Sequence, residues 1–186
     1  MVRNHGKEPE PMVSESRYIM SSSSATPHPL TWVEIDLNAI SHTLRQIKNK
    51  VHPAGAEILA VVKDNAYGHG AVEVARIAAG VPVKMLGVAM IQEALELREA
   101  AVDLPILSLC CILPEQAEEV VLHDITQTVC ELSICEALSR EAVRTNRQAK
   151  VHVKIDTGMG RIGVQCDEAA QLMESMAQLP GLTVEG

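Results

Sequence analysis

From Thr31 onward the chain alternates short apolar runs with amphipathic stretches, and this alternation restricts its fold more than any other feature. It is typical of parallel strands joined by helical crossovers. The predicted strands are Trp32–Ile35, Ile58–Val62, Met85–Ala89, Pro105–Leu109, Thr126–Cys130, Val151–Ile155 and Leu182–Glu185. Starting at Ile58, they make about five β/α units and the start of a sixth. An open doubly wound sheet and an eight-fold barrel that is only partly present both fit this pattern.

Apolar residues at helical spacing predict the helices between these strands. The helices are expected at about 40–51, 71–79, 91–101, after Pro114, from Ser133, and at about 167–179. Ser133 and Glu136 have the spacing of a capping box. The run Ile58–Val62 is continuously apolar and rich in β-branched residues, which predicts a strand buried on both faces.

Residues 1–30 differ from the remainder of the chain. They contain four consecutive serines from Ser21 to Ser24, four prolines and few large apolar residues. Such a segment cannot bury enough surface to offset its ordering entropy, so we expect a disordered tail, with a folded domain over residues 31–186. Met20, directly before the serines, is an alternative translational start.

Charge and hydropathy exclude several classes of protein. The net charge of −8 argues against nucleic-acid binding, which needs a basic surface. No window approaches the ~20 apolar residues of a membrane span, and the first residues lack the apolar core of a secretory signal, so we expect a cytoplasmic protein. The five cysteines form no CxxC pair or metal-like cluster. In particular, Cys110 and Cys111 are expected to be small core residues rather than redox or metal sites.

The segment Ala60-Val-Val-Lys63-Asp-Asn-Ala-Tyr67-Gly-His-Gly70 ends a predicted strand with a lysine. The carboxyl ends of parallel strands are where such sheets hold their active sites. Partial desolvation beside Val61 and Val62 is expected to lower the pKa of Lys63, which supplies the neutral amine that a Schiff base requires. The alternative is a structural lysine that reaches solvent from a strand end.

The segment Val151-His-Val-Lys154-Ile-Asp156-Thr-Gly-Met-Gly-Arg161-Ile-Gly163 again joins a strand to a glycine-rich loop. Lys154 and Asp156 are two residues apart, which places them on one face of a strand. Arg161 can pair with a substrate carboxylate or, in the structural alternative, with Asp156. Neither nucleotide-binding glycine motif is present, so a nucleotide site is not expected.

These two segments, written AVVKDNAYGHG and KIDTGMGRIG, closely resemble the N-terminal signatures of alanine racemases, which are fold-type III pyridoxal-phosphate enzymes. TWVEIDLNAI, LGVAMIQEALELR and LPGLTVEG extend the resemblance over about residues 31–186. Asp64 stands where the family more often has a small residue. The resemblance implies a (β/α)8 barrel, of which this chain holds about five to six β/α units, while the C-terminal β domain is absent. It also places the strand at Trp32–Ile35 with that β domain.

The resemblance further implies pyridoxal 5'-phosphate as cofactor and L- and D-alanine as substrates, with D-alanine supplied for peptidoglycan. Lys63 would form the internal aldimine and act as one of two bases at Cα. Tyr67 would contact the cofactor phosphate. Arg161 would lie near the phenolic oxygen of the cofactor and the substrate carboxylate, and Lys154 would be the position that is often carbamylated.

The family works as a homodimer, and its opposite-face tyrosine and most of its phosphate site would lie beyond residue 186. We therefore expect a fragment, a split gene or an incomplete gene model, which folds poorly by itself, and the activity of this chain alone stays open. The alternatives are another fold-type III racemase or decarboxylase, and a non-catalytic cofactor-binding module.

Overall fold

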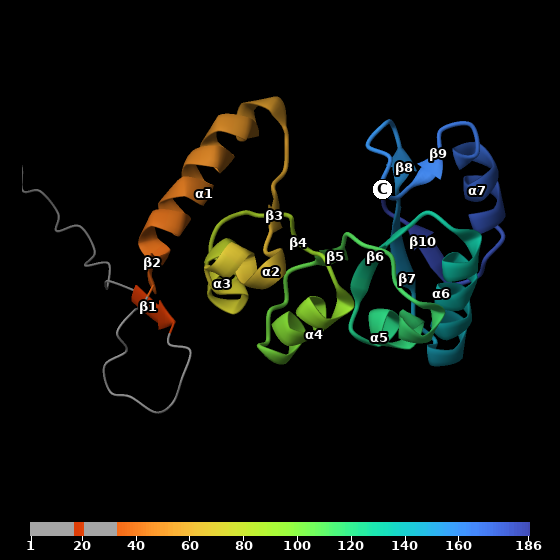
Figure 1. The fold of residues 1–186 in the computed structure, drawn as a ribbon, viewed down its shortest axis with the longest axis horizontal. Coiled ribbons are helices and arrows are strands. Elements are labelled where there is room, and N and C mark those ends of the chain that lie inside the picture. The colour runs from red at the N-terminus through yellow and green to blue at the C-terminus, as the bar shows by residue number, and fades with distance from the viewer. Residues whose placement is uncertain (1–16, 21–32) are drawn as a thin grey trace, which may run out of the picture.

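The computed structural model describes residues 17–20 and 33–186, and its centre is a six-stranded parallel sheet (Figure 1). Across the sheet the strands are β10 (Leu182–Val184), β7 (Ala149–Val153), β6 (Ile125–Val129), β5 (Ile106–Ser108), β4 (Met85–Val88) and β3 (Leu59–Val61). Every neighbouring pair is parallel. The order along the sheet follows the order along the chain without reversal. A doubly wound sheet reverses its strand order, so the arrangement is a partial β/α barrel.

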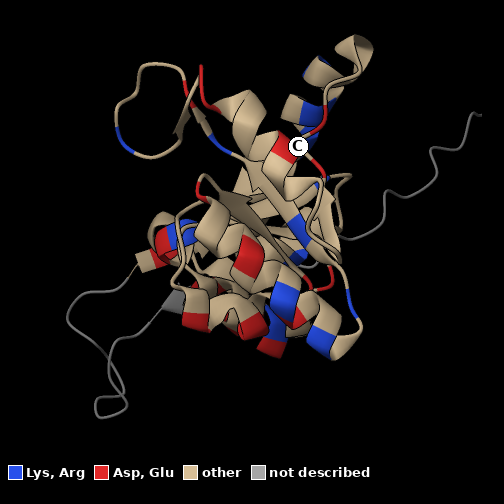
Figure 2. Ribbon diagram, turned by 90° about the vertical axis from the view of Figure 1, so that its right-hand side faces the viewer, with Lys and Arg blue, Asp and Glu red and all other residues tan. Residues whose placement is uncertain are grey.

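The helices follow the predicted alternation. They are α1 (Leu37–Val51), α2 (Lys63–Gly68), α3 (Ala71–Ala79), α4 (Ile91–Glu99), α5 (Ala117–Leu122), α6 (Leu132–Thr145) and α7 (Ala169–Met176), with short 3-10 turns at His52–Ala54 and Pro114–Gln116. Figure 2 shows that charged residues lie mainly on the helices and loops, whereas the strands are largely uncharged.

The core lies between the sheet and its helices. Leu86, Ile106 and Ile125 are paired in register on β4, β5 and β6, and all three are almost completely buried. They form a continuous apolar row against buried side chains of the helices, such as Leu97 and Leu138. Burial of each such side chain stabilises the fold by about 1.5–3 kcal/mol. The row fixes the strand register and hence which residues reach the carboxyl edge of the sheet.

The N-terminal part is separate from this sheet. β1 (Arg17–Met20) pairs antiparallel with β2 (Val33–Asp36), which is the strand predicted at 32–35. The Asp36 carboxylate caps α1 by accepting hydrogen bonds from the backbone N–H groups of Asn38 and Ala39, at 2.9 and 3.1 Å. The tail expected at 1–30 lies outside the described residues, apart from the four residues of β1.

Two predictions about these elements are wrong. Leu59 and Val61 of β3 are 37% and 38% exposed, so the strand is not buried on both faces. The reason is that β3 is the last strand in the sheet order and has a neighbouring strand on one side only. The capping box also fails, because α6 begins at Leu132 and leaves Ser133 and Glu136 inside the helix. Within the described ranges, no helix has the length and apolar character needed to cross a membrane.

Candidate active site at the carboxyl edge of the sheet

Lys63 follows β3 and begins a left-handed helical turn. In the middle of α2, residues Asp64 to Tyr67 all have φ between 52° and 54° and ψ between 37° and 47°. L-residues avoid this conformation at a cost of roughly 1–2 kcal/mol each, and Asp and Asn tolerate it better than Ala66 and Tyr67 do. A run of this kind persists only where the surroundings determine it, and such strain is concentrated at functional sites.

Glu93 of α4 is the main external support of this turn. One carboxylate oxygen accepts a hydrogen bond from the backbone N–H of Asp64 at 2.6 Å. The other accepts from the N–H groups of Ala89 and Met90, at 2.7 and 3.0 Å. One carboxylate thereby ties the residue after Lys63 to the end of β4, and charge-assisted bonds of this type are the strong ones.

Asn65 links the turn to the start of α3 through its side chain and its backbone. Its side-chain oxygen accepts a hydrogen bond from the backbone N–H of Ala71, the first residue of α3, at 2.8 Å. Its backbone carbonyl accepts from Gly70 at 3.0 Å. Gly68 and Gly70 have φ values of 86° and 90°, which explains the two glycines of the motif. The turn is thus anchored to both the sheet and the next helix.

The amine of Lys63 lies in a different electrostatic environment from the one we expected. Its Nζ lies 3.2 Å from Oδ2 of Asp64 and 5.7 Å from the ring centroid of Tyr67. The hydrogen bond to Asp64 and the charge of that carboxylate raise the pKa of Lys63, and desolvation opposes them only weakly. The predicted lowering of the pKa is therefore wrong, because the side chain is 37% exposed and has an adjacent anion.

The second motif forms a tight loop around Asp156. Lys154 follows β7, and Asp156 ends the short strand β8 (Ile155–Asp156), which pairs with β9 (Val164–Gln165). The Asp156 carboxylate accepts hydrogen bonds from the backbone N–H groups of Gly158 and Gly160, at 3.0 to 3.1 Å. These bonds lower the pKa of Asp156. The carboxylate therefore stabilises the backbone of its own loop.

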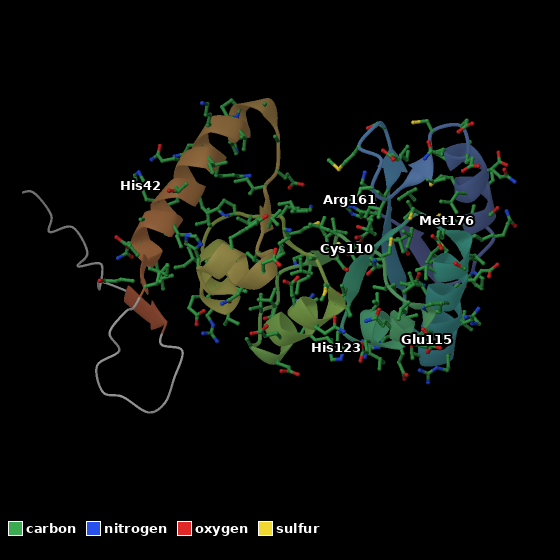
Figure 3. All side chains as sticks on the ribbon, viewed as in Figure 1. His42, Cys110, Glu115, His123, Arg161 and Met176 are labelled. Atoms are coloured by element: carbon green, nitrogen blue, oxygen red, sulfur yellow. The ribbon has the colours of Figure 1, made fainter. Side chains whose placement is uncertain are left out.

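Arg161 lies on the exposed part of this loop, and Figure 3 shows it with Cys110 near the same edge of the sheet. Among the described residues no ion pair joins Arg161 to Asp156, so the structural alternative for this arginine is not realised. Lys154 donates a hydrogen bond to the carbonyl of Ile155 at 3.2 Å.

The structure brings some predicted site residues together and leaves others apart. Lys63 and Tyr67 share one turn, and Lys154 and Arg161 share one loop. The two motifs follow β3 and β7, which are separated in the sheet by β4, β5 and β6. Both lie at carboxyl ends of parallel strands, which is the active-site edge of β/α barrels.

The prediction of a core role for Cys110 and Cys111 is wrong, because both are exposed. Cys166 is exposed too, whereas Cys135 is buried. Cys110 and Cys111 follow β5 at the edge that also carries Lys63, where the chain leaves the sheet. An apolar sequence run does not indicate burial where the strand has already ended. Burial raises the pKa of the Cys135 thiol to about 11.

Sequence reasoning missed Glu93 and Asn65. Glu93 stands at the third position of α4, where a carboxylate commonly accepts bonds from a helix N-terminus, and this was the available signal. Its bond to Asp64 spans 29 residues and is not visible in any local pattern.

Comparison with known proteins gives a consistent family. The sequence profile described as "Alanine racemase, N-terminal domain" matches residues 35–186. "Alanine racemase 1" of Caldanaerobacter subterraneus subsp. tengcongensis is 45% identical over 157 residues, which cover 84% of this chain and 40% of that protein. "Alanine racemase" of Methanococcus maripaludis is 38% identical, with 86% and 42% covered. The chain therefore spans about two-fifths of the length of these relatives.

Solved structures agree. An alanine racemase of Clostridium difficile 630 superposes with a TM-score of 0.77 at 38% identity, covering 81% of this chain and 39% of that one. The alanine racemase of Bacillus anthracis with bound L-Ala-P gives a TM-score of 0.73 at 36% identity, covering 81% and 39%. Both matches extend over most of the described residues.

Proposed function

Because the chain belongs to the alanine racemase N-terminal domain family, we propose that it provides the lysine-bearing part of an enzyme that interconverts L- and D-alanine. The observation that carries this proposal is the left-handed turn after β3, which holds Lys63 and Tyr67 at the carboxyl edge of a partial β/α barrel. An isolated structural lysine would not need a turn that is strained at four consecutive residues and supported by Glu93.

The residues present fit pyridoxal 5'-phosphate as the cofactor. The Lys63 amine is accessible for covalent attachment to its carbonyl carbon, and the exposed Tyr67 hydroxyl is suited to a phosphate oxygen. Arg161, unpaired with Asp156, is free for the phenolic oxygen of the cofactor or for a substrate carboxylate. When bound, this cofactor delocalises the charge left at Cα after a proton is removed.

The chain's own residues then divide the work of binding and proton transfer. Lys63 in its neutral form accepts a proton at Nζ from one face of Cα and returns it there. Inversion at Cα needs a second base on the opposite face, which we assign to a partner subunit in a homodimer. Lys154, if carbamylated, becomes an anion that can orient Arg161 through its guanidinium.

Cofactor attachment can be tested on the chain as it stands. We expect incubation with pyridoxal phosphate, followed by borohydride, to fix the cofactor to Lys63, which peptide mass spectrometry locates. Lys84 is the matched control, because it is an exposed lysine that directly precedes β4 at the opposite edge. Lys63→Ala should abolish the specific label and Lys84→Ala should keep it. Equal labelling of both variants would contradict the proposed role of Lys63.

The substrate is tested separately by incubation in D2O with the cofactor and either L-alanine or D-alanine, because Lys63 serves one face of Cα and can exchange the hydrogen of one enantiomer. We expect Lys63-dependent exchange of the Cα hydrogen, detected by mass spectrometry, and racemisation when the second base is also present. Exchange with other amino acids but not with alanine would favour another racemase or decarboxylase of this fold type. Attachment without any exchange would favour a cofactor-binding module.

A further inference from the structure

Two cysteines at the same edge of the sheet lie close together. Sγ of Cys111, which follows β5, is 3.9 Å from Sγ of Cys130, which follows β6. In the last printed register pair of these strands, Ser108 lies opposite Gln127. Both cysteines come shortly after the ends of these strands, three residues beyond that pair. Neither residue has a part in the proposed racemase chemistry.

We propose that Cys111 and Cys130 form a reversible dithiol–disulfide site that reacts with peroxides at the edge beside Lys63. This proposal does not depend on the proposed racemase function. It rests on the juxtaposition of the two thiols just after adjacent strands, on their access to solvent, and on hydrogen bonds that hold Cys110, the residue before Cys111.

The backbone geometry suits a disulfide. At the last register pair, Ser108 and Gln127, adjacent strands lie about 4.7–4.9 Å apart. Disulfides span Cα separations of about 4.4–6.8 Å. Gln127 Nε2 donates a hydrogen bond to the carbonyl of Cys110 at 2.7 Å. The backbone N–H of Cys110 donates to the carbonyl of Ala89 at 3.3 Å. Because both neighbouring strands hold the residue before Cys111, the bond requires rotation of side chains rather than movement of the backbone.

A small oxidant can reach the pair. Cys111 is exposed and Cys130 is half-buried, and a cavity of about 110 Å³ opens beside both. Burial raises the pKa of the Cys111 thiol, and the neighbouring Cys130 sulfur raises it further. The thiolate is the reactive form, so oxidation should become faster as the pH rises from about 7 to about 9.

The chemistry balances with hydrogen peroxide as the oxidant. The Cys111 thiolate attacks one peroxide oxygen, the O–O bond breaks, and hydroxide leaves and takes up a proton to give water, which leaves a sulfenic acid on Cys111. The Cys130 thiolate then attacks that sulfur, and the S–S bond forms as the S–O bond breaks and a second water leaves. In sum, two thiols lose two hydrogens and one peroxide becomes two waters.

Peptide mapping of the full chain tests the proposal. Cleavage after glutamate releases Ala100–Glu115, which holds Cys110 and Cys111, and Val120–Glu131, which holds only Cys130. After peroxide treatment we expect these two peptides to be joined with the loss of two hydrogens, and dithiothreitol to separate them. Cys111→Ser and Cys130→Ser should each abolish the cross-link, whereas the matched control Cys110→Ser should keep it.

Three results would overturn the proposal. They are a cross-link that survives Cys111→Ser, a disulfide confined to Cys110 and Cys111 within one peptide, and oxidation of the wild-type chain to sulfinic acid without any cross-link. A wild-type map in which these two peptides are never joined would overturn the proposal whether or not the variants fold. Tandem mass spectrometry of the joined wild-type peptides assigns the bond to Cys110 or to Cys111.

Discussion

The amine of Lys63 lies 3.2 Å from the carboxylate of Asp64, the residue that follows it in the chain. The contact lies at the start of the left-handed turn, of which Asp64 is the first residue. The resemblance to alanine racemases leads us to expect a small side chain more often at this position. The carboxylate of Asp64 acts directly on the proposed cofactor lysine.

Asp64→Asn should lower the pKa of Lys63. The Asp64 carboxylate stabilises the ammonium form, so the wild-type amine is neutral only at a higher pH than an ordinary lysine. The stabilisation by this pair is accordingly present below the usual lysine pKa and disappears as the pH rises through the raised one. The amine of the variant should react faster with pyridoxal phosphate at neutral pH. NMR titration of the methylated lysine measures the pKa directly.

The control for this experiment is Asp103→Asn, which removes an exposed carboxylate far along the chain from Lys63. It should leave the pKa and the rate of labelling unchanged. A Lys63 pKa that is the same in Asp64→Asn and in the wild type would show that the ion pair does not control this amine.

Glu93→Gln should loosen the turn that carries Lys63. The amide retains one acceptor oxygen but places an NH2 group against N–H donors, so at least one of the bonds to Asp64, Ala89 and Met90 is lost. Loss of a charge-assisted bond costs about 1.5–3 kcal/mol. The amides of Asp64 and Ala89 should therefore exchange with D2O at least roughly tenfold faster by NMR.

Glu96→Gln on the exposed face of the same helix is the matched control and should leave that exchange unaffected. Unchanged exchange at Asp64 in Glu93→Gln would mean that the turn is stable without the carboxylate.

Local patterns in the sequence predicted the alternation of strands and helices well but could not decide how the strands are ordered. Each strand segment is defined by a short apolar run, whereas the choice between a barrel and a doubly wound sheet depends on which side each helix packs. The left-handed turn was not predictable, because Ala66 and Tyr67 have no preference for it and Glu93 comes 29 residues after Asp64. The pKa of Lys63 was predicted wrongly for a related reason. Flanking valines suggested burial, but β3 lies at an edge of the sheet.

The amide protons of Gly158 and Gly160 should report the ionisation of Asp156. Both donate to its carboxylate, and these bonds lower the pKa of Asp156. Their contribution to stability is present above the usual aspartate pKa and is lost as the pH falls through the lowered value. The two NMR signals should titrate together with a midpoint below the ordinary aspartate pKa. A midpoint at or above the ordinary value would contradict the loop geometry.

Asp156→Ala should expose the loop to proteolysis at Arg161. Without the carboxylate, the N–H groups of Gly158 and Gly160 lose their partner, and local opening of the loop becomes easier. Tryptic cleavage after Arg161 should be roughly fivefold faster, as followed by mass spectrometry. Asp167→Ala, which removes another exposed carboxylate nearby, should not change the rate. Equal cleavage of the two variants would show that Asp156 does not order the loop.

Arg98→Lys should lower the free energy of unfolding, because Arg98 holds the segments that lead into the amino-terminal ends of β5 and β6. The guanidinium donates to four backbone carbonyls, those of Val102, Leu104, His123 and Asp124, at 2.6 to 3.1 Å. It thereby ties the end of α4 to the loops that lead into β5 and β6. A lysine has a single ammonium group without the planar fork, so it cannot reach all four oxygens, and we expect a loss of roughly 2–3 kcal/mol in the free energy of unfolding.

Urea denaturation followed by circular dichroism measures this loss. Arg140→Lys is the matched control, because Arg140 lies on the exposed face of α6 and has none of these bonds. It should change the free energy of unfolding by less than about 0.5 kcal/mol. If Arg98→Lys were equally well tolerated, the carbonyls would be satisfied by water. The four hydrogen bonds of Arg98 would then result from the positions of the loops and would not determine them.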